Sequence, residues 1–323
     1  MKQSVLVLGA SGFIGRRVVA TLAATDWARP VLGIHRRPVS DSGSLEHRVL
    51  DATRVESIRE ALRDVRAVVN CVAGDSQTLV ASAQTLAAAA APITPPPRIV
   101  HLSTMSVYGS AVGEIDESTP LRADLGPYSV AKGAAEAALS SCADAVIFRP
   151  GCVFGPGSPQ WTERIARLLL SGRLGDLGAT GNGYCNLVHV DDVALAVRRA
   201  LEEDRPSGRV FNLAVREPPT WNEALAEYSR ALRAPAVRRI SPLRLKVESR
   251  LLAPPLKVAE ICARAAGLGS SALPPPIPGS LLRLMGQRIR LDSRNARAAL
   301  GIEFRDVAGT LGDSAAWVLG SGR

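Results

Sequence analysis

Three glycines stand between a short apolar run and a segment of helical spacing near the start of the chain. The run 4–8 (SVLVL) is apolar after its serine, which is typical of a strand buried in a parallel sheet. Gly9, Gly12 and Gly15 follow directly, and helical spacing then extends over 13–24. Glycines at such a turn let the backbone approach a pyrophosphate at a helix N-terminus. A plain strand-to-helix turn is the simpler interpretation, but the place straight after the first strand favours a dinucleotide site.

Strand-like and helix-like segments alternate over about the first 150 residues. Short apolar runs predict further strands at 30–34, 67–72, 98–102 and 145–148. Segments of helical spacing between them predict helices at 55–63, 77–91 and 128–141. This alternation predicts an α/β fold with a Rossmann-like, doubly wound parallel sheet.

The pattern loosens after residue 150, where glycine and proline cluster at 155–159 and 172–183. A clear helix at 191–202 and a strand at 210–213 follow, and the remainder is mostly helical with proline breaks. We therefore predict a dinucleotide-binding domain and a smaller, mostly helical C-terminal substrate region. The dinucleotide-binding domain is expected to span 1–158 and to be completed by about 187–213. The substrate region is expected to comprise 159–186 and 214–323.

Composition excludes several classes of protein. The 323 residues include 39 Lys and Arg against 30 Asp and Glu, a net charge of +9, but only four are lysines and no long basic run appears. This distribution speaks against nucleic-acid binding. The five cysteines form no CxxC pair, which speaks against a disulfide scaffold or a metal site and fits a reduced, cytoplasmic location. No stretch of about 18 apolar residues predicts a membrane span.

The end of the second predicted strand bears on the choice of dinucleotide. A site that binds the free 2′-hydroxyl of the adenosine ribose usually has an acidic residue here, because its carboxylate accepts the hydrogen bond of that hydroxyl. The sequence has His35, Arg36 and Arg37 instead, and paired arginines suit a 2′-phosphate, so NADP(H) is favoured over NAD(H). The alternative is that both arginines are solvated loop residues. Asp51 follows the apolar pair 49–50 and either approaches the adenine or caps the next helix.

Tyr128 and Lys132 are spaced i,i+4 and would share one face of a helix. A nearby ammonium favours the phenolate and lowers the pKa of tyrosine, which suits acid–base catalysis near neutral pH. An ordinary surface pair is the alternative. Ser103 and Thr104 follow the fourth predicted strand, and either hydroxyl could hydrogen-bond a substrate carbonyl oxygen or merely cap the turn.

These motifs occur in one order that resembles the extended short-chain dehydrogenase/reductase family, the NAD-dependent epimerase/dehydratase group. The resemblance covers about the first 215 residues and rests on five motifs: GASGFIG (9–15), STMSVYG (103–109), YSVAK (128–132), RPGCVFGPG (149–157) and VHVDDVA (188–194). It implies that Thr104 is the hydroxyl of a catalytic triad, Tyr128 its general acid/base, and Lys132 the ligand of the nicotinamide ribose. The implied cofactor contacts are Gly9, Ser11, Gly12, Phe13, Ile14, Gly15, His35, Arg36, Arg37, Asp51, Ala52, Val72, Ala73, Lys132, Pro150 and Val153.

Two departures from the family pattern concern the substrate. Members acting on nucleotide-sugars often carry asparagine where this chain has Cys152, and an arginine for the diphosphate where it has Cys185. The sequence around 187–194 looks more like the dihydroflavonol-reductase and 3β-hydroxysteroid-dehydrogenase branch, whose substrates are apolar. Candidate substrate contacts are Met105, Ser106, Cys152 and Cys185. The histidine and aspartate at 189 and 191 are interpreted as structural, at a helix entry.

The predicted function is therefore an NADP-dependent ketoreductase or alcohol dehydrogenase for an apolar small molecule. The alternatives are a nucleotide-sugar epimerase or dehydratase with tightly bound NAD, and a cofactor-sensing protein without turnover. The resemblance also implies a homodimer that pairs through the helices at 77–91 and 128–141, which are both rich in alanine; the alternative is that alanine is simply frequent in this chain. The apolar residues of 243–261 are typical of ordinary core; a substrate lid, or peripheral contact with a membrane surface through the cations nearby, are the alternatives.

Overall fold

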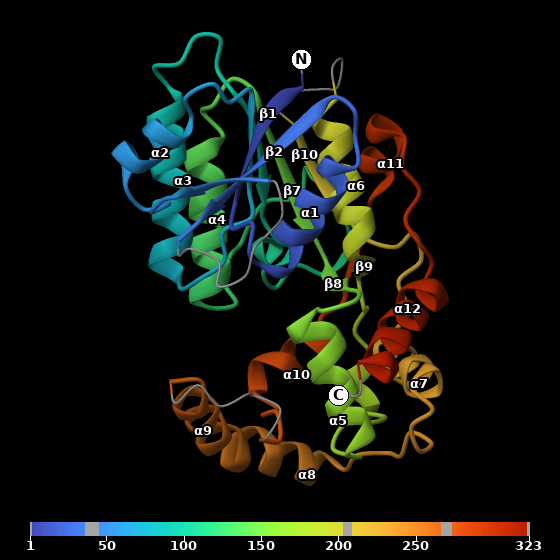
Figure 1. The fold of residues 1–323 in the computed structure, drawn as a ribbon. Helices are drawn as coiled ribbons and strands as arrows, with labels where there is room; N and C mark the ends of the chain where they lie inside the picture. The colour runs from blue at the N-terminus through green and yellow to red at the C-terminus, as the bar shows by residue number, and fades with distance from the viewer. Residues whose placement is uncertain (1, 36–44, 203–208, 266–272, 322–323) are drawn as a thin grey trace.

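A seven-stranded parallel sheet forms the centre of the molecule, whose computed structural model describes residues 2–35, 45–202, 209–265 and 273–321. The strand order is β10-β7-β5-β4-β1-β2-β3 (Figure 1). The strands are β1 (Gln3–Leu8), β2 (Ala28–Ile34), β3 (Glu46–Val49), β4 (Ala67–Asn70), β5 (Arg98–Leu102), β7 (Ala145–Pro150) and β10 (Arg209–Leu213). The order reverses between β1 and β4, and ligands of open parallel sheets bind at such a switch point. The predicted fold class is thus confirmed.

Helices cover both faces of this sheet, because its central strands are apolar on both sides. Along β1, Val5 and Val7 belong to one hydrophobic cluster, whereas Leu6 and Leu8 belong to another. The first cluster is covered by α1 (Phe13–Ala23), α6 (Val190–Leu201) and α11 (Arg294–Leu300); the second by α2 (Val55–Ala61), α3 (Ser76–Ala90) and α4 (Pro127–Leu139). The uninterrupted apolar runs of the sequence follow from this two-sided burial.

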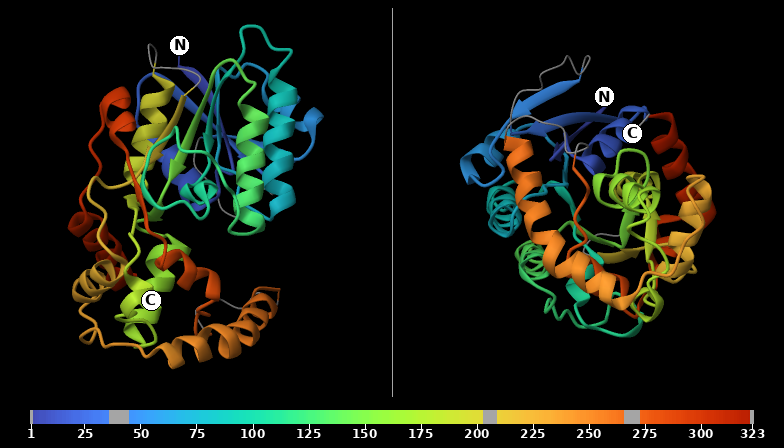
Figure 2. Two further views of the ribbon diagram at one scale, coloured as in Figure 1. Left: turned by 180° about the vertical axis from the view of Figure 1, so that it is seen from behind. Right: turned by 90° about the horizontal axis from the view of Figure 1, so that it is seen from below.

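A second lobe lies beyond the carboxyl ends of the strands and has its own core (Figures 1 and 2). Trp161 and Trp221 lie 5.5 Å apart between ring centroids there, next to Phe154. The lobe contains η2 (Pro159–Glu163), α5 (Arg164–Leu170), η3 (Gly178–Gly181), α7 (Trp221–Ala231), α8 (Pro242–Val247), η4 (Glu248–Leu252), α9 (Ala253–Ala265), α10 (Gly279–Met285) and α12 (Val307–Gly320).

Two small parallel sheets connect these parts, β6 (Gly113–Ile115) with β11 (Ile289–Leu291), and β8 (Cys152–Phe154) with β9 (Leu187–His189). The segment 187–213 therefore divides: β10 lies beside β7 in the central sheet, whereas β9 lies outside it. Helix α11 packs on β10 and α6, although the sequence placed it in the substrate region. Strand β3 was not predicted because it is a polar edge strand that pairs with β2 alone.

The segment 243–261 differs most from its predicted environment. It was interpreted as ordinary core, yet Leu243, Leu251, Val258 and Ile261 are all more than half exposed. The core prediction for this segment is wrong, because apolar helical spacing shows that a face is apolar but not that a partner covers it.

Candidate active site

A cavity of about 490 Å³ opens where the carboxyl ends of β1, β2 and β4 meet. Several of the residues expected to bind a dinucleotide line it together, although they come from four separate stretches of sequence. The lining residues are Gly9, Ser11, Gly33, Ile34, His35, Leu50, Asp51, Ala52, Thr53, Val72, Ala73, Gly74, Asp75 and Thr78. Arg36 and Arg37 lie outside the described residues.

The glycine turn is as close-packed as the predicted site requires. Gly9 has φ +73°, and a Cβ there would lie 2.6 Å from the carbonyl oxygen of Cys71 on the neighbouring strand. A Cβ at Gly15 would lie 2.2 Å from the carbonyl oxygen of Gly9. Helix α1 begins directly after the glycines. Its first helical turn, which includes Phe13 and Ile14, contains no acidic residue, and no side chain caps its N-terminus. Its backbone N–H groups therefore fit the pyrophosphate of a dinucleotide.

Asp51 lies on the opposite wall of this cavity. Its carboxylate accepts hydrogen bonds from the backbone N–H (2.9 Å) and hydroxyl (2.6 Å) of Thr53, and these bonds lower the pKa of Asp51. Helix α2 begins later, with Arg54 at its N-cap. Asp51 therefore closes a local turn and does not cap the helix, which leaves it on the wall where the adenosine half of a dinucleotide fits.

The predicted catalytic residues meet next to this cavity. Thr104 follows β5 and stands at the N-cap of η1 (Met105–Tyr108), where its hydroxyl accepts from the backbone N–H of Ser106 at 3.2 Å. The side chain of Thr104 also hydrogen-bonds the hydroxyl of Tyr128 in the first turn of α4. Lys132, one turn later, is buried and donates to the carbonyl of Leu102 at 2.7 Å.

The charge distribution differs from the sequence-based expectation in one respect. Burial raises the pKa of Tyr128, and the hydrogen bond with Thr104 offsets this only in part, although 51% of the residue's surface is exposed. Lys132 does not lower the pKa of Tyr128 here, because its ammonium is turned to Leu102. Burial lowers the pKa of Lys132 to about 8. At neutral pH, Tyr128 is thus a protonated phenol and Lys132 is mostly an ammonium.

His101 on β5 lies beside Lys132, although the sequence predicted no role for it. Its side chain is buried, neither ring nitrogen has a hydrogen-bond partner, and burial followed by the Lys132 charge lowers its pKa far below the usual value. Asn70 pairs with His101 in register on the neighbouring strand, and its amide nitrogen also lacks a partner. The polar side chains that the neighbouring strands place in this region, those of His101 and Asn70, are therefore neutral.

A buried polar network connects α4, the helix of Tyr128 and Lys132, to the sheet. Glu136, one turn after Lys132, accepts a short hydrogen bond from Ser103 and forms an ion pair with Arg149 at 2.6 Å. Arg149 also donates to the Tyr108 hydroxyl at 3.0 Å. The Ser103 hydroxyl is thus hydrogen-bonded to Glu136, so the hydroxyl available beside Tyr128 is that of Thr104. Sequence reasoning missed the network, and its one local signal is the i,i+4 spacing of Glu136 from Lys132.

Replacing Glu136 with glutamine is expected to lower the free energy of unfolding by about 3–5 kcal/mol, because the buried Arg149 guanidinium would lose its counter-charge. Urea unfolding followed by circular dichroism measures the change. The matched control is Glu114→Gln, which breaks the exposed pair with Arg294 and should cost less than about 1 kcal/mol. Equal losses in the two variants would contradict a structural role for the buried pair.

The four candidate substrate contacts have different environments. Met105 is buried and Ser106 half-buried beside Thr104. Cys152 and Cys185 are 3% and 0% exposed in the core of the second lobe, and burial raises the pKa of both thiols. A substrate would reach these two only by displacing packed side chains, so the structure gives no support for direct contact. The cofactor candidates Pro150 and Val153 are likewise buried, at β7 and β8.

The histidine and aspartate of the VHVDDVA motif lie away from Tyr128. His189 is the N-cap of α6, and its ring nitrogen accepts from the backbone N–H of Asp191 at 3.1 Å. This arrangement fits the structural role expected for the pair.

Comparison with known families shows which family this chain belongs to. The model of the NAD dependent epimerase/dehydratase family matches residues 5–214, about two thirds of the chain. The chain belongs to this family. The match spans the glycine turn, the Thr104–Tyr128–Lys132 set and the VHVDDVA motif, so the resemblance to extended short-chain dehydrogenases is confirmed and the protein is an NAD-dependent type of enzyme.

Individual relatives are distant. A "2-alkyl-3-oxoalkanoate reductase" of Stenotrophomonas maltophilia is 25% identical over 267 residues, which cover 72% of this chain and 77% of that protein. The structure is similar to MoeE5 in complex with UDP-glucuronic acid and NAD (TM-score 0.73, 23% identity, 98% of this chain and 99% of that one). It is also similar to the human epimerase family protein SDR39U1 with NADPH (TM-score 0.73, 19% identity, 97% and 99%). These two likenesses concern the fold alone.

None of the helices in the described part of the chain combines the length and the hydropathy that crossing a bilayer requires.

Proposed function

We propose that this enzyme reduces the carbonyl group of an apolar small molecule with NADPH. The observation that carries the proposal is the placement of Tyr128 and Lys132 one turn apart on α4, with Thr104 beside the Tyr128 hydroxyl and Lys132 anchored to the Leu102 carbonyl. A protonated phenol can donate to a carbonyl oxygen as it gains negative charge. Cys185, where nucleotide-sugar enzymes of the family carry a diphosphate-binding arginine, is buried among apolar side chains. The reductase name of the Stenotrophomonas relative, which specifies an alkyl-substituted oxo acid, supports the same chemistry.

The mechanism assigns each step to a residue of this chain. When bound, the reduced nicotinamide supplies the hydride. Thr104 orients the carbonyl oxygen, and the Tyr128 hydroxyl transfers its proton to that oxygen. The Lys132 ammonium donates one hydrogen bond to the Leu102 carbonyl, and its other N–H groups would hold the ribose hydroxyls. The glycine turn and the first turn of α1 would bind the pyrophosphate, and Asp51 and Ala52 the adenosine end.

Preference for NADPH is part of the proposal. It rests on the absence of an acidic residue after β2 and on Arg36 and Arg37 there in the sequence, while His35 at the end of β2 lines the cavity. The solved relatives are described with NAD in one case and NADPH in another, so the family uses both.

The alternative is epimerisation or dehydration of a nucleotide-sugar on tightly bound NAD, which is favoured by the likeness to MoeE5 with its UDP-glucuronic acid. Cofactor stoichiometry separates the two. Purified enzyme is mixed with NADPH or NADH and a series of 3-oxo acids and ketones of increasing chain length, and the 340 nm absorbance is followed. Net oxidation of NADPH supports the proposal. Turnover of a UDP- or dTDP-sugar without net change in cofactor overturns it.

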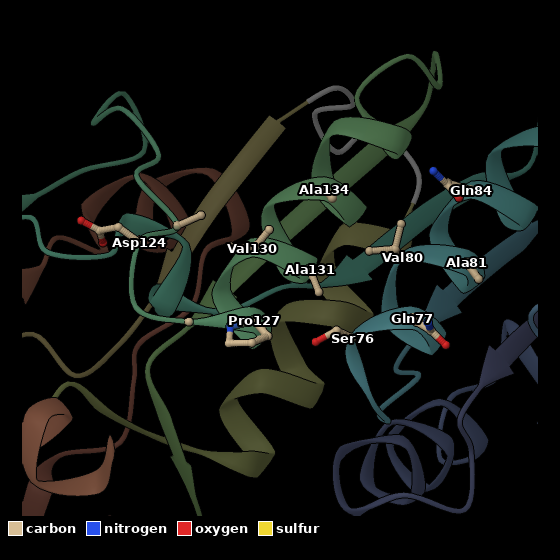
Figure 3. Close-up of a pocket in the computed structure, with 12 residues that line it drawn as sticks. Ser76, Gln77, Val80, Ala81, Gln84, Asp124, Pro127, Val130, Ala131 and Ala134 are labelled. Carbon is tan, nitrogen blue, oxygen red and sulfur yellow. The ribbon is translucent and has the colours of Figure 1, made fainter. Parts of the chain in front are cut away.

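We also propose that the protein is a homodimer that pairs through α3 and α4. The two helices pack side by side and present small and apolar side chains along a shallow groove of about 750 Å³ (Figure 3). Val130 is 56% exposed there, near Ala134 of the same helix and Val80 and Ala81 of α3. A second copy of the same face would cover these side chains, since small residues let helices approach closely.

Size-exclusion chromatography with light scattering tests the dimer. We expect the wild type to elute with the mass of two chains and Val130→Glu with the mass of one, because a charge would be buried without a partner. The matched control is Val49→Glu, an equally exposed valine on the edge strand β3, which should stay dimeric. A monomeric wild type would contradict the proposal.

A further inference from the structure

The arm of residues 242–265, formed by α8, η4 and α9, carries an uncovered apolar face. Figure 2 (right) shows it in orange, running across the near side of the molecule when seen from below. Of the fourteen large apolar residues exposed in the described chain, six lie in this arm, which makes up less than a tenth of the sequence. These six are Leu243, Val247, Leu251, Leu252, Val258 and Ile261. Such clustering differs from the scattered exposure that is normal at a protein surface.

The spacing of these residues groups them on one side within each α-helix of the arm. Leu243 and Val247 are i,i+4 in α8, and Val258 and Ile261 are i,i+3 in α9. Leu251 and Leu252 lie in the π-helical turn η4 between the two helices. The arm already has an inner face, on which Leu245, Glu248 and Ala253 are buried against the second lobe. The exposed stripe is therefore a second apolar face, and no other described element covers it.

The charged residues of the arm also differ in their surroundings: cations are exposed, and the acidic residues are paired. Four of its cations, Arg244, Lys246, Arg250 and Lys257, are exposed. Its two acidic residues are both engaged: Glu248 is buried and bound to Arg173, whose Nε donates to it at 3.1 Å, and Glu260 is paired with Lys257 at 3.0 Å. The outer surface thus combines exposed leucines with a positive charge excess.

We infer that the outer face of this arm binds the surface of an anionic lipid bilayer, with its apolar stripe among the upper acyl chains and its cations at the lipid phosphates. An amphipathic helix with cations beside its apolar face binds in this interfacial position without spanning the membrane. The 24 residues would extend about 36 Å along the bilayer plane. The exposed cations beside the apolar face favour a bilayer over a protein partner, because lipid phosphates supply the matching negative charge. The inference does not depend on which carbonyl compound the enzyme reduces.

Vesicle flotation with the full-length protein tests this inference. The wild type is mixed at low and at physiological salt with vesicles of phosphatidylcholine alone, or of phosphatidylcholine with 30% phosphatidylglycerol, as the probe. We expect binding to the anionic vesicles that weakens as salt rises, since exposed charges are screened. Lys246→Gln/Arg250→Gln should weaken it by about thirtyfold, the equivalent of about 1 kcal/mol per cation at the surface.

The apolar stripe is tested separately with Leu251→Ser/Val258→Ser. This variant should lose binding to anionic vesicles by tenfold or more, while its circular dichroism and its turnover of a water-soluble ketone stay at the wild-type level. The matched control is Val112→Ser, which removes an equally exposed valine elsewhere and should bind like the wild type. Three results would overturn the inference: no preference of the wild type for anionic vesicles, unchanged binding of both double variants, or a change in oligomeric mass caused by the stripe variant.

Discussion

Tyr128→Phe is expected to lower the turnover of ketone reduction by about 10²–10⁴-fold, the usual contribution of a positioned general acid. The substitution removes only the hydroxyl that hydrogen-bonds Thr104 and leaves the ring in place. Binding of NADPH should be unchanged, because Lys132 is held by the Leu102 carbonyl and not by Tyr128. Steady-state kinetics gives the first quantity, and titration of cofactor fluorescence gives the second.

The control removes the same atom from a tyrosine outside the site. Tyr228 is buried in the second lobe, where its hydroxyl donates to the Thr162 carbonyl at 3.1 Å. Tyr228→Phe should therefore cost about 1 kcal/mol of stability and leave turnover intact. Turnover like the wild type in Tyr128→Phe would refute the proposed mechanism and would favour a cofactor-sensing role without catalysis.

The parts of the molecule that were predictable are those in which a local pattern determines the outcome. The run 4–8 is apolar on both sides because β1 is buried on both faces, and this alone indicated a parallel sheet. Tyr128 and Lys132 were predicted because one helical step brings them together, whereas only the family resemblance distinguished Thr104 from Ser103. In contrast, strand β3 is short, polar and at the edge, and its sequence carries no alternation.

The remaining differences depend on contacts between distant segments. Ser103 follows β5, whereas Glu136 lies on α4 and Arg149 on β7, and no spacing rule indicates that they share one buried network. The expected effect of Lys132 on the pKa of Tyr128 failed for a similar reason, since a backbone carbonyl on β5 holds the ammonium. Likewise, the exposed arm has the sequence of a core helix, and only the missing partner distinguishes it.

Gly15→Ala is expected to weaken productive cofactor binding strongly. A Cβ at this position would lie 2.2 Å from the carbonyl oxygen and 2.9 Å from the carbonyl carbon of Gly9, and these are backbone atoms that cannot rotate away. The turn must open, at a cost of about 1–3 kcal/mol in stability. Displacing the pyrophosphate by about 1 Å should lower kcat/KM for NADPH by about a hundredfold.

Gly312→Ala is the matched control for this substitution. Gly312 lies within α12, where an added Cβ would meet no atom within 4 Å. Alanine there should raise stability by up to about 1 kcal/mol through helix propensity and leave NADPH binding unchanged. Thermal unfolding and NADPH titration of both variants measure the two effects. If Gly15→Ala bound NADPH like the wild type, the glycine turn would not be the pyrophosphate site, since opening the turn must move the first N–H groups of α1.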